Sequence, residues 1–450
     1  MQKARVAAPL GVILLILSFL CPQELSLYVA GLRLPPHRVA LIALLPVAFM
    51  RLMSGREIKP QSFDILFMLF AIWTTWVYAY HAGHEGFVYG GSMALESLGG
   101  YLIARAFIRN EAEFRGSLRF LLFAIAAAAL LAIMDTVSGN YFVHSILRQF
   151  VGGDPLPPMQ YRMGLARAAS VFDHPIHYGT FCAALLAVFW FTEKQTASRV
   201  TQSAVASVAT LLGMSSAPLL CIGLQGSMIA WERATRGISL RTPITLALIA
   251  GLFIGVALIS SRGPVQIIAT TFTLDSWTGY YRTQIWEFGL QNVWAHPWAG
   301  IGLGEWDRPK WMVSSTVDAF WLVTAMRSGI PGFLLIAVPT VLIGRAVVKR
   351  AIHGRDANRR RMAQGWMISL VALCLIATTV HYWNVVQAFF FFFIGLGGWL
   401  ADPVRERARV AAGATRPSRP RHPSFLRPAS PRPAPQPDLG FPGIPVPAFQ

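Results

Sequence analysis

One segment of the chain gathers ionisable side chains among tryptophans and glycines, the residue types that can carry out chemistry. It spans residues 282–332, begins with Arg282, passes His296, and carries Asp318 and Arg327 in its second half. The chain around it is strongly apolar, so the segment lies at the edge of a membrane. Charged groups gathered at the face of a membrane protein indicate a functional site, and the sequence predicts one here.

A helix and a glycine-rich turn are predicted inside this segment. After Arg282, apolar residues recur at the spacing of one helix face, which predicts a helix lying on the membrane surface. These residues are Ile285, Phe288, Leu290 and Val293. The sequence HPWAGIGLG, starting at His296, then ends the helix in a turn. Glycines let backbone amides approach an anion closely, although the same pattern is also typical of a plain tight loop.

The elements that must hold this segment are membrane helices. Of the 450 residues, 54% are hydrophobic and only 13% are charged, whereas a soluble domain carries about 25% charged residues. Apolar runs long enough to cross a bilayer recur, and only α-helices satisfy the backbone of such runs. Their centres lie near residues 14, 44, 72, 99, 127, 184, 207, 224, 251, 340, 373 and 393. We therefore predict an all-α polytopic bundle of about twelve transmembrane helices over residues 1–401.

Orientation follows from the positions of lysine and arginine. They fall in alternate short loops, at Arg51, Arg109, Arg115, Arg199 and Lys349 among others, whereas residues 81–90 contain none. Basic loops stay in the cytoplasm, which places both termini inside. The N-terminal apolar run lacks the small residues that signal cleavage requires, so it is predicted to be the first span. Two long loops, about 138–175 and about 261–317, then lie outside, and we expect short helices in them.

Composition also excludes some classes of protein. The formal net charge of +18 lies mostly in loops between spans, so no nucleic-acid partner is predicted. The four cysteines lie in or beside apolar runs without a Cys-x-x-Cys pair, which indicates neither a disulfide framework nor a zinc site. Residues 402–450 are rich in proline and arginine and are predicted to form a disordered cytoplasmic tail. This tail is either simply solvated or a proline-rich ligand for a partner.

The order of these motifs resembles one family. The chain is similar to the O-antigen ligase and polymerase superfamily in the order of an arginine, a tryptophan, HPWAGIGLGEW and then DAFWLVTAMRSGIPGFLL. Upstream, GLARAASVFDHPIHYGTF, which contains Arg167 and His174, resembles the other loop-to-helix signature of that family. The resemblance covers most of residues 7–400. It implies a bacterial inner-membrane protein that handles sugars carried on undecaprenyl diphosphate.

The resemblance implies a glycosyltransferase that works at the periplasmic face without a metal or cofactor. Its implied partners are an undecaprenyl-diphosphate-linked oligosaccharide, membrane lipid, chain-length regulators and export proteins. Ligases of the family carry His-Asn eleven residues before the Gly-x-Pro-Gly turn, where this chain has Asp318-Ala319. That departure favours a polymerase of repeat units for exopolysaccharide or O-antigen. A ligase that passes glycan to lipid A-core, in lipopolysaccharide synthesis, and a non-enzymatic flippase are the alternatives. A second departure is Ser215-Ser216, where the family has Ser-Arg.

The family pattern also suggests a role for each residue. Arg282 binds the diphosphate, because arginine bonds phosphate oxygens in pairs, and Asp318 acts as base or orients the acceptor sugar. As alternatives, Arg282 only reaches for the membrane interface and Asp318 only caps a helix. Secondary substrate-binding candidates are Arg167, His174, His296 and Arg327. Arg327 is predicted either to contact phosphate or to anchor its helix.

Glu96 stands alone inside the fourth predicted span. A carboxylate inside a membrane is costly and is usually paired or functional. Arg105 lies nine residues further along, on the opposite face of an ideal helix. The partner of Glu96 must therefore come from another helix.

Overall fold

The computed structural model describes residues 8–29, 32–55, 58–152, 156–235, 276–354, 356–402 and Gly443. The chain divides into two units, Met1–Val404 and Arg405–Gln450, and the description below concerns the first. Apart from Asp402 and Gly443, the predicted disordered tail lies outside the described residues, as do the predicted span near residue 251 and the first part of the second long loop.

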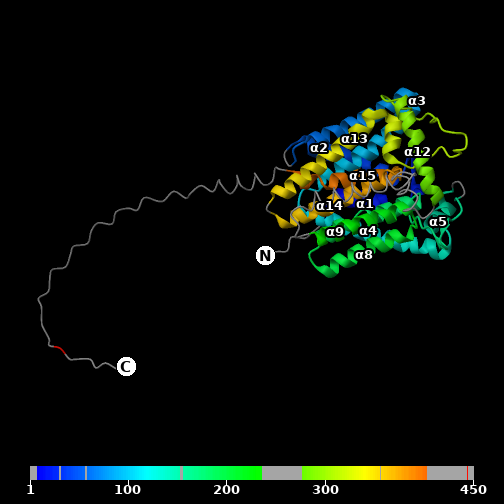
Figure 1. The fold of residues 1–450 in the computed structure, drawn as a ribbon. Helices are drawn as coiled ribbons and strands as arrows, with labels where there is room; N and C mark the ends of the chain where they lie inside the picture. Colours follow the sequence, from blue (N-terminus) through cyan, green and yellow to red (C-terminus); the bar gives the residue numbers. More distant parts are fainter. Residues whose placement is uncertain are drawn as a thin grey trace, which may run out of the picture. The chain divides into compact units, whose positions relative to one another are not determined.

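The first unit is mostly helical (Figure 1). They are α1 (Leu10–Phe19), the 3-10 helix η1 (Gln23–Leu25), α2 (Pro36–Met53), α3 (Ser62–Phe107), α4 (Glu111–Ser138), α5 (Phe142–Val151), α6 (Pro175–Ala183), α7 (Leu186–Thr192), α8 (Thr196–Leu212), α9 (Ser216–Ala234), α12 (Ser276–Ala295), α13 (Phe320–His353), α14 (Ala357–Ile376), α15 (Asn384–Leu396) and α16 (Gly398–Ala401). Two short antiparallel hairpins pair β1 (Leu27–Val29) with β2 (Leu32–Leu34) and β3 (Tyr161–Arg162) with β4 (Leu165–Ala166).

Six helical stretches among the described residues are long and apolar enough to cross a membrane. They are Pro36–Met53, Ser62–Phe107, Glu111–Ser138, Pro175–Thr192, Phe320–His353 and Asn384–Ala401. This confirms the prediction of a mostly helical membrane protein. Ten of the predicted centres lie in helices, and the one near residue 184 lies in the turn between α6 and α7. The centre near residue 251 lies outside the described residues, and the count of about twelve spans and the loop layout stay predictions. The ten residues of α1 are too few to cross a bilayer core alone.

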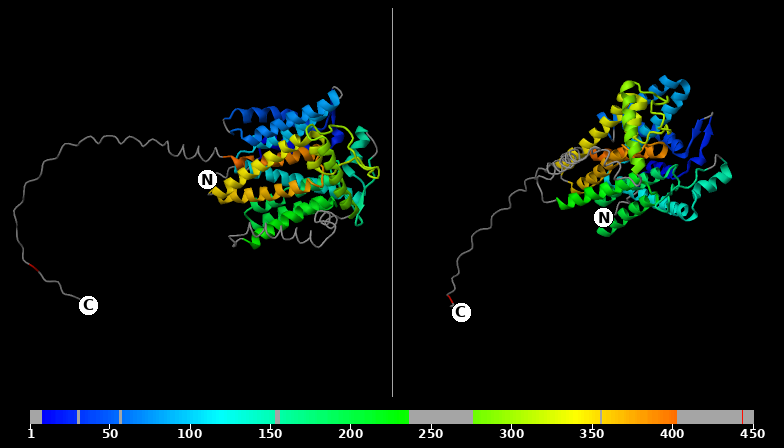
Figure 2. Two further views of the ribbon diagram at one scale, coloured as in Figure 1. Left: turned by 45° about the horizontal axis from the view of Figure 1, so that its top comes forward. Right: turned by 45° about the vertical axis from the view of Figure 1, so that its right-hand side comes forward.

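α3 is a helical hairpin rather than one straight helix. Its 46 residues are interrupted by non-helical backbone at Ala82 and Gly83. The two arms return alongside each other, so that the rings of Phe67 and Tyr101 lie with centroids 4.4 Å apart. The loop predicted at residues 81–90 is this bend and the beginning of the second arm. Figures 1 and 2 show the arms beside the long helix α13.

Several basic loops meet at one end of the helices. Arg115 donates a hydrogen bond to the Thr192 carbonyl (2.8 Å), and Arg361 donates one to the Glu193 carbonyl (3.0 Å). Arg359, at the start of α14, donates a hydrogen bond to the carbonyl of Trp399 in α16 (2.7 Å). These loops belong to the set that the charge pattern assigns to one side of the membrane. The opposite ends of the same helices, where α6 and α15 begin, hold the polar groups described below.

A buried ion-pair network stabilises the basic end. Arg105, which is fully buried, bonds Asp64 at 3.1 Å and Asp402 at 2.8 Å. The hydroxyl of Tyr101 donates to the same Asp64 carboxylate. The network ties both arms of α3 to the end of α16, so it fixes three helix ends at once.

Replacing this arginine should destabilise the protein strongly. Arg105→Ala leaves two carboxylates without their cation, and breaking such a buried pair costs about 3–5 kcal/mol. The midpoint of thermal unfolding in detergent should fall, whereas Lys349→Ala, at an exposed position on the same side, should leave it unchanged. Equal unfolding midpoints for the two variants would show that the network contributes little.

Candidate functional site

A short hairpin and a buried carboxylate hold the first signature loop in place. Arg162 ends β3 and pairs with Leu165 of β4 across a turn in which Met163 and Gly164 have φ values of 51° and 79°. Such left-handed pairs form the tight turns that match the twist of a hairpin. Asp135, at the end of α4, accepts hydrogen bonds from the amides of residues 169 and 170 (3.0 and 2.8 Å). The loop between these anchors is therefore held at both ends.

Two arginines of this loop converge on the break between α8 and α9. Arg167, only 5% exposed, donates to the hydroxyl of Ser215 at 2.9 Å and to the side chain of Gln160. Arg162 donates to the hydroxyl of Ser216 at 3.4 Å. Neutral oxygens thus receive hydrogen bonds from both guanidinium groups, and no carboxylate within salt-bridge distance of either is seen in the described part of the chain.

Arg282 reaches the same region from α12. This helix packs closely on α13, because a methyl group added at Gly289 would lie 2.6 Å from Leu322. The indole of Trp286 also donates to the carbonyl of Thr378 at 2.8 Å, which fixes the rotation of α12. Arg282 is 9% exposed, and its buried Nε has no hydrogen-bond partner among the described residues. This burial favours a role in a site over a side chain that only reaches for the membrane interface, and the role of Arg282 stays a prediction.

Asp318 lies just before α13, and its charge interacts with that of Arg282. Burial raises the pKa of Asp318 above its ordinary value, although the charge of Arg282 opposes this rise. Burial lowers the pKa of Arg282, Asp318 opposes this, and Arg162 adds to the lowering. Ala319, not Asp318, is the N-cap of α13, and no side chain bonds its first amides. The alternative role of Asp318 as a helix cap is therefore wrong.

The three arginines repel one another. Burial, and then the charges of Arg162 and Arg282, lower the pKa of Arg167 to about 10. We call Arg162, Arg167 and Arg282, with Asp318, the arginine cluster. It combines three guanidinium groups with one carboxylate, an excess of positive charge in a poorly solvated place. Such an excess is costly without an anion, so the arrangement is suited to binding one.

His174 belongs to the same neighbourhood and is uncharged. It is the N-cap of α6, and its Nδ1 accepts a hydrogen bond from the amide of Ile176 at 3.1 Å. Burial, followed by the charges of Arg167 and Arg162, lowers its pKa to about 4. The neutral ring therefore carries its proton on Nε2 and can act there as a donor.

Two other predicted site residues do not join this cluster. The side chain of His296 is exposed and makes no hydrogen bond to a described residue. Arg327 donates to the carbonyls of Gly302 (2.8 Å) and Gly304, so it holds the turn after α12 in place. No direct contact links it to the arginine cluster. The charge of Arg327 acts instead on His381, whose pKa it helps to lower.

The glycine-rich turn is a tight loop, and its amides are already used. Ile301 and Gly302 donate to the carbonyls of Met326 and Arg327 at 2.8 and 3.1 Å, and Gly304 donates to Ile301 at 2.9 Å. Gly302 has a φ of +53°, and a methyl group there would lie 2.6 Å from His81. The glycines are therefore required for packing against α3 and α13, and these amides do not form an anion site.

Sequence reasoning missed Arg162 and the partners of Glu96. Glu96 is paired with His37 Nε2 at 3.1 Å and Arg38 Nε at 2.8 Å, both on α2. This confirms that its partner comes from another helix. Arg162 precedes the motif that begins at Gly164. The sequence indicated it only through its position close to Arg167 in the same loop.

The arginines are the cations that this site provides. Among the described residues, no group of three or more His, Cys, Asp or Glu side chains is placed to hold a metal ion. No protein-family model matches the chain, and a search of curated proteins finds none similar to it. The interpretation of the site therefore depends on its geometry and on the motifs of the sequence.

Proposed function

We propose that the protein is a membrane glycosyltransferase that joins oligosaccharides carried on a polyprenyl diphosphate. The observation that carries this proposal is the arginine cluster, in which the buried Arg282 acts electrostatically on Arg167 and Asp318 and its Nε has no hydrogen-bond partner among the described residues. A diphosphate supplies the negative charge that this cluster lacks. Arginine is also suited to it by geometry, because its fork bonds two phosphate oxygens at once.

The proposed reaction uses the cluster in two ways. An acceptor hydroxyl attacks the first carbon of the donor sugar, the bond from that carbon to the diphosphate oxygen breaks, and polyprenyl diphosphate leaves. The arginines stabilise the charge that develops on the leaving oxygen. Asp318 takes the proton of the attacking hydroxyl, for which its raised pKa makes it a stronger base than an ordinary aspartate. The arginines provide the positive charge, so no metal is part of the proposal.

The resemblance to O-antigen ligases and polymerases supports this reaction. The two positions at which the chain departs from the family pattern, Ser216 and Asp318, are compatible with it. Where the family has an arginine after serine, this chain has Ser216, and Arg162 brings a guanidinium to that hydroxyl from another loop. The charge missing from the motif is thus supplied by a different residue. Asp318 in place of His-Asn favours a polymerase of lipid-linked repeat units over a ligase.

The proposed location is the periplasmic face of a bacterial inner membrane. The arginine cluster lies where α6 and α13 begin, and the basic loops meet where α7 and α16 end. If the basic end is cytoplasmic, as basic loops generally are, the cluster faces outward. Both chain ends are then cytoplasmic.

Deletion of the gene distinguishes the three candidate functions. Loss of a polymerase should leave glycans of one repeat unit, whereas loss of a ligase should leave polymer on its lipid carrier. Loss of a flippase should trap lipid-linked units on the cytoplasmic side. The purified protein, reconstituted with lipid-linked repeat units, should lengthen them without any other protein. A wild-type glycan profile in the deletion strain would contradict all three.

A further inference from the structure

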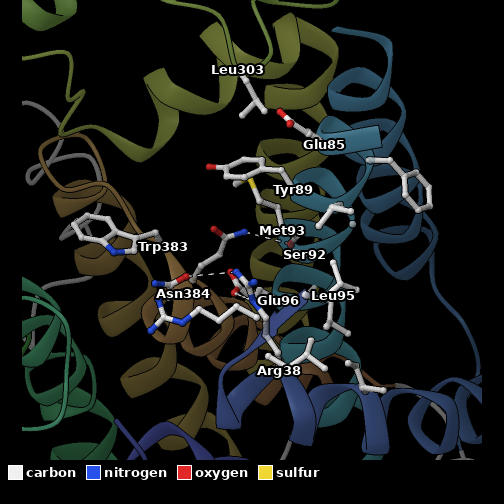
Figure 3. A pocket seen from close by; sticks show the side chains of 18 of the residues that line it. Arg38, Glu85, Tyr89, Ser92, Met93, Leu95, Glu96, Leu303, Trp383 and Asn384 are labelled. Atoms are coloured by element: carbon white, nitrogen blue, oxygen red, sulfur yellow. Dashed lines mark hydrogen bonds and ion pairs between the residues drawn. The ribbon is translucent and has the colours of Figure 1, made fainter. Parts of the chain in front are cut away.

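A second feature of the same face is a pocket of about 890 Å³ beside the arginine cluster. Its lining comes from β2, α2, the second arm of α3, the turn after α12 and the residues that begin α15. Figure 3 shows Arg38, Glu96 and Asn384 grouped at one end, Glu85 and Leu303 at the other, and Tyr89 and Trp383 on opposite sides. The volume is in the range of pockets that enclose small ligands.

The charges in this pocket balance, unlike those of the arginine cluster. Arg33 and Arg38 contribute two positive charges, and Glu85 and Glu96 contribute two negative ones. Glu96 is 2% exposed and is bonded to Arg38, so the deepest charges already neutralise each other. A phosphate would meet a carboxylate here as readily as an arginine. The pocket is therefore suited to an uncharged polar ligand.

Its walls combine aromatic faces with free polar atoms. Tyr89 is 45% exposed, and its hydroxyl projects into the pocket without a hydrogen bond to any described residue. His381 also lines the pocket, and its buried Nδ1 has no partner among the described residues. Burial, with the charge of Arg327, lowers the pKa of His381 to about 4, so the ring is neutral and offers both a donor and an acceptor. A buried polar atom without a partner is rare in a protein core, so this nitrogen can bond a ligand that enters the pocket.

Trp383 connects the pocket to the arginine cluster. Its ring lines the pocket and also lies with its centroid 3.7 Å from that of His177 and 6.3 Å from that of His174. His174 in turn feels the charges of Arg162 and Arg167. The two sites are therefore neighbours, separated by one layer of aromatic side chains.

We infer that this pocket binds the uncharged oligosaccharide of the acceptor, next to the diphosphate of the donor. Sugar rings present hydroxyl groups at the rim and apolar faces above and below, which the free polar atoms and the rings of Tyr89 and Trp383 complement. The role of this oligosaccharide as the acceptor rests on the proposed function. The binding of an uncharged glycan can be tested without it.

The test uses the full-length protein in lipid nanodiscs and two probes. The first is the oligosaccharide released by mild acid from the lipid-linked glycans of the source cell and tagged at its reducing end. This molecule carries no diphosphate and can only accept. The second probe is polyprenyl diphosphate. Binding of each is measured by equilibrium titration, and transfer from lipid-linked repeat units to the tagged oligosaccharide gives KM and kcat.

Two variants remove groups from the pocket, and one serves as a matched control. Tyr89→Ala removes an aromatic face, and His381→Phe keeps a ring but removes both nitrogens. Each should weaken oligosaccharide binding and raise its KM by roughly tenfold, while kcat and polyprenyl diphosphate binding stay unchanged. Tyr80→Ala, on the same helix but 68% exposed and outside the pocket lining, should behave as wild type.

The outcomes separate the two ideas. The pocket assignment is wrong if the wild-type protein does not bind the tagged oligosaccharide, or if both pocket variants bind it as tightly as wild type. Oligosaccharide binding that is lost in the pocket variants, without any transfer by the wild-type protein, would overturn the proposed function and leave the pocket standing. Arg282→Ala should weaken binding of polyprenyl diphosphate alone.

Discussion

Arg282→Ala is expected to lower the rate of glycan lengthening by about 100- to 1000-fold, the usual loss when one preorganised group that stabilises a leaving charge is removed. The reason is the position of this side chain. It is 9% exposed, its buried Nε has no hydrogen-bond partner among the described residues, and the charges of Asp318 and Arg162 act on it. Its Nε is therefore available to a phosphate without breaking a bond to a described residue. The rate is measured with purified protein and lipid-linked repeat units.

Two further variants show whether this loss comes from the loss of a phosphate contact. Arg282→Lys keeps the charge but loses the fork, so it should recover part of the rate and part of the binding of polyprenyl diphosphate. Lys310→Ala removes an exposed charge from the same segment and should leave both unchanged. If Arg282→Ala lengthens glycans at the wild-type rate, the arginine cluster does not bind the diphosphate.

Asp318→Asn is the second change with a large expected effect. The amide cannot accept the proton of the attacking hydroxyl, and a positioned base contributes about 100- to 10,000-fold to such a reaction. Because asparagine has nearly the same shape as aspartate, binding of polyprenyl diphosphate should persist while kcat falls. Asp307→Asn, an exposed aspartate in the same segment, is the matched control and should keep full activity.

The pH profile gives an independent check on Asp318. A base must be ionised, so the wild-type rate should fall as the pH drops through the pKa of Asp318. Burial raises that pKa above the ordinary value of 3.8, and the fall should therefore begin at a higher pH than for a solvated aspartate. The residual rate of Asp318→Asn should not show this fall. An acidic limb that persists in the variant would assign the proton to another group.

The general architecture could be predicted because its signals are local. Apolar runs long enough to cross a bilayer core predict helices. Basic loops that alternate along the chain predict which helix ends lie on the same side of the membrane. Neither prediction requires knowledge of tertiary contacts. Motif order likewise selected Arg282, Asp318, Arg167 and His174, four residues that the structure brings to one neighbourhood. Their proposed roles remain to be tested by the variants above.

Pairings between distant helices could not be predicted. Glu96 finds His37 and Arg38 on α2, and Arg162 reaches Ser216 across 54 residues, because helix packing and not local sequence sets these distances. The glycine-rich turn shows the same limit from the other side. Its composition fits an anion site, but the amides of Ile301 and Gly302 are taken by carbonyls of α13.

The pocket beside the cluster is entirely a product of packing. Residues that line it come from five separate parts of the chain, and only Leu303 belongs to a motif quoted from the sequence. Hydropathy and motif letters thus determined that this is a helical membrane protein with arginines and an aspartate near one face. Only the fold determined which hydrogen-bond donors of these side chains are occupied. The reason is that their partners come from residues distant in the sequence, which helix packing brings close.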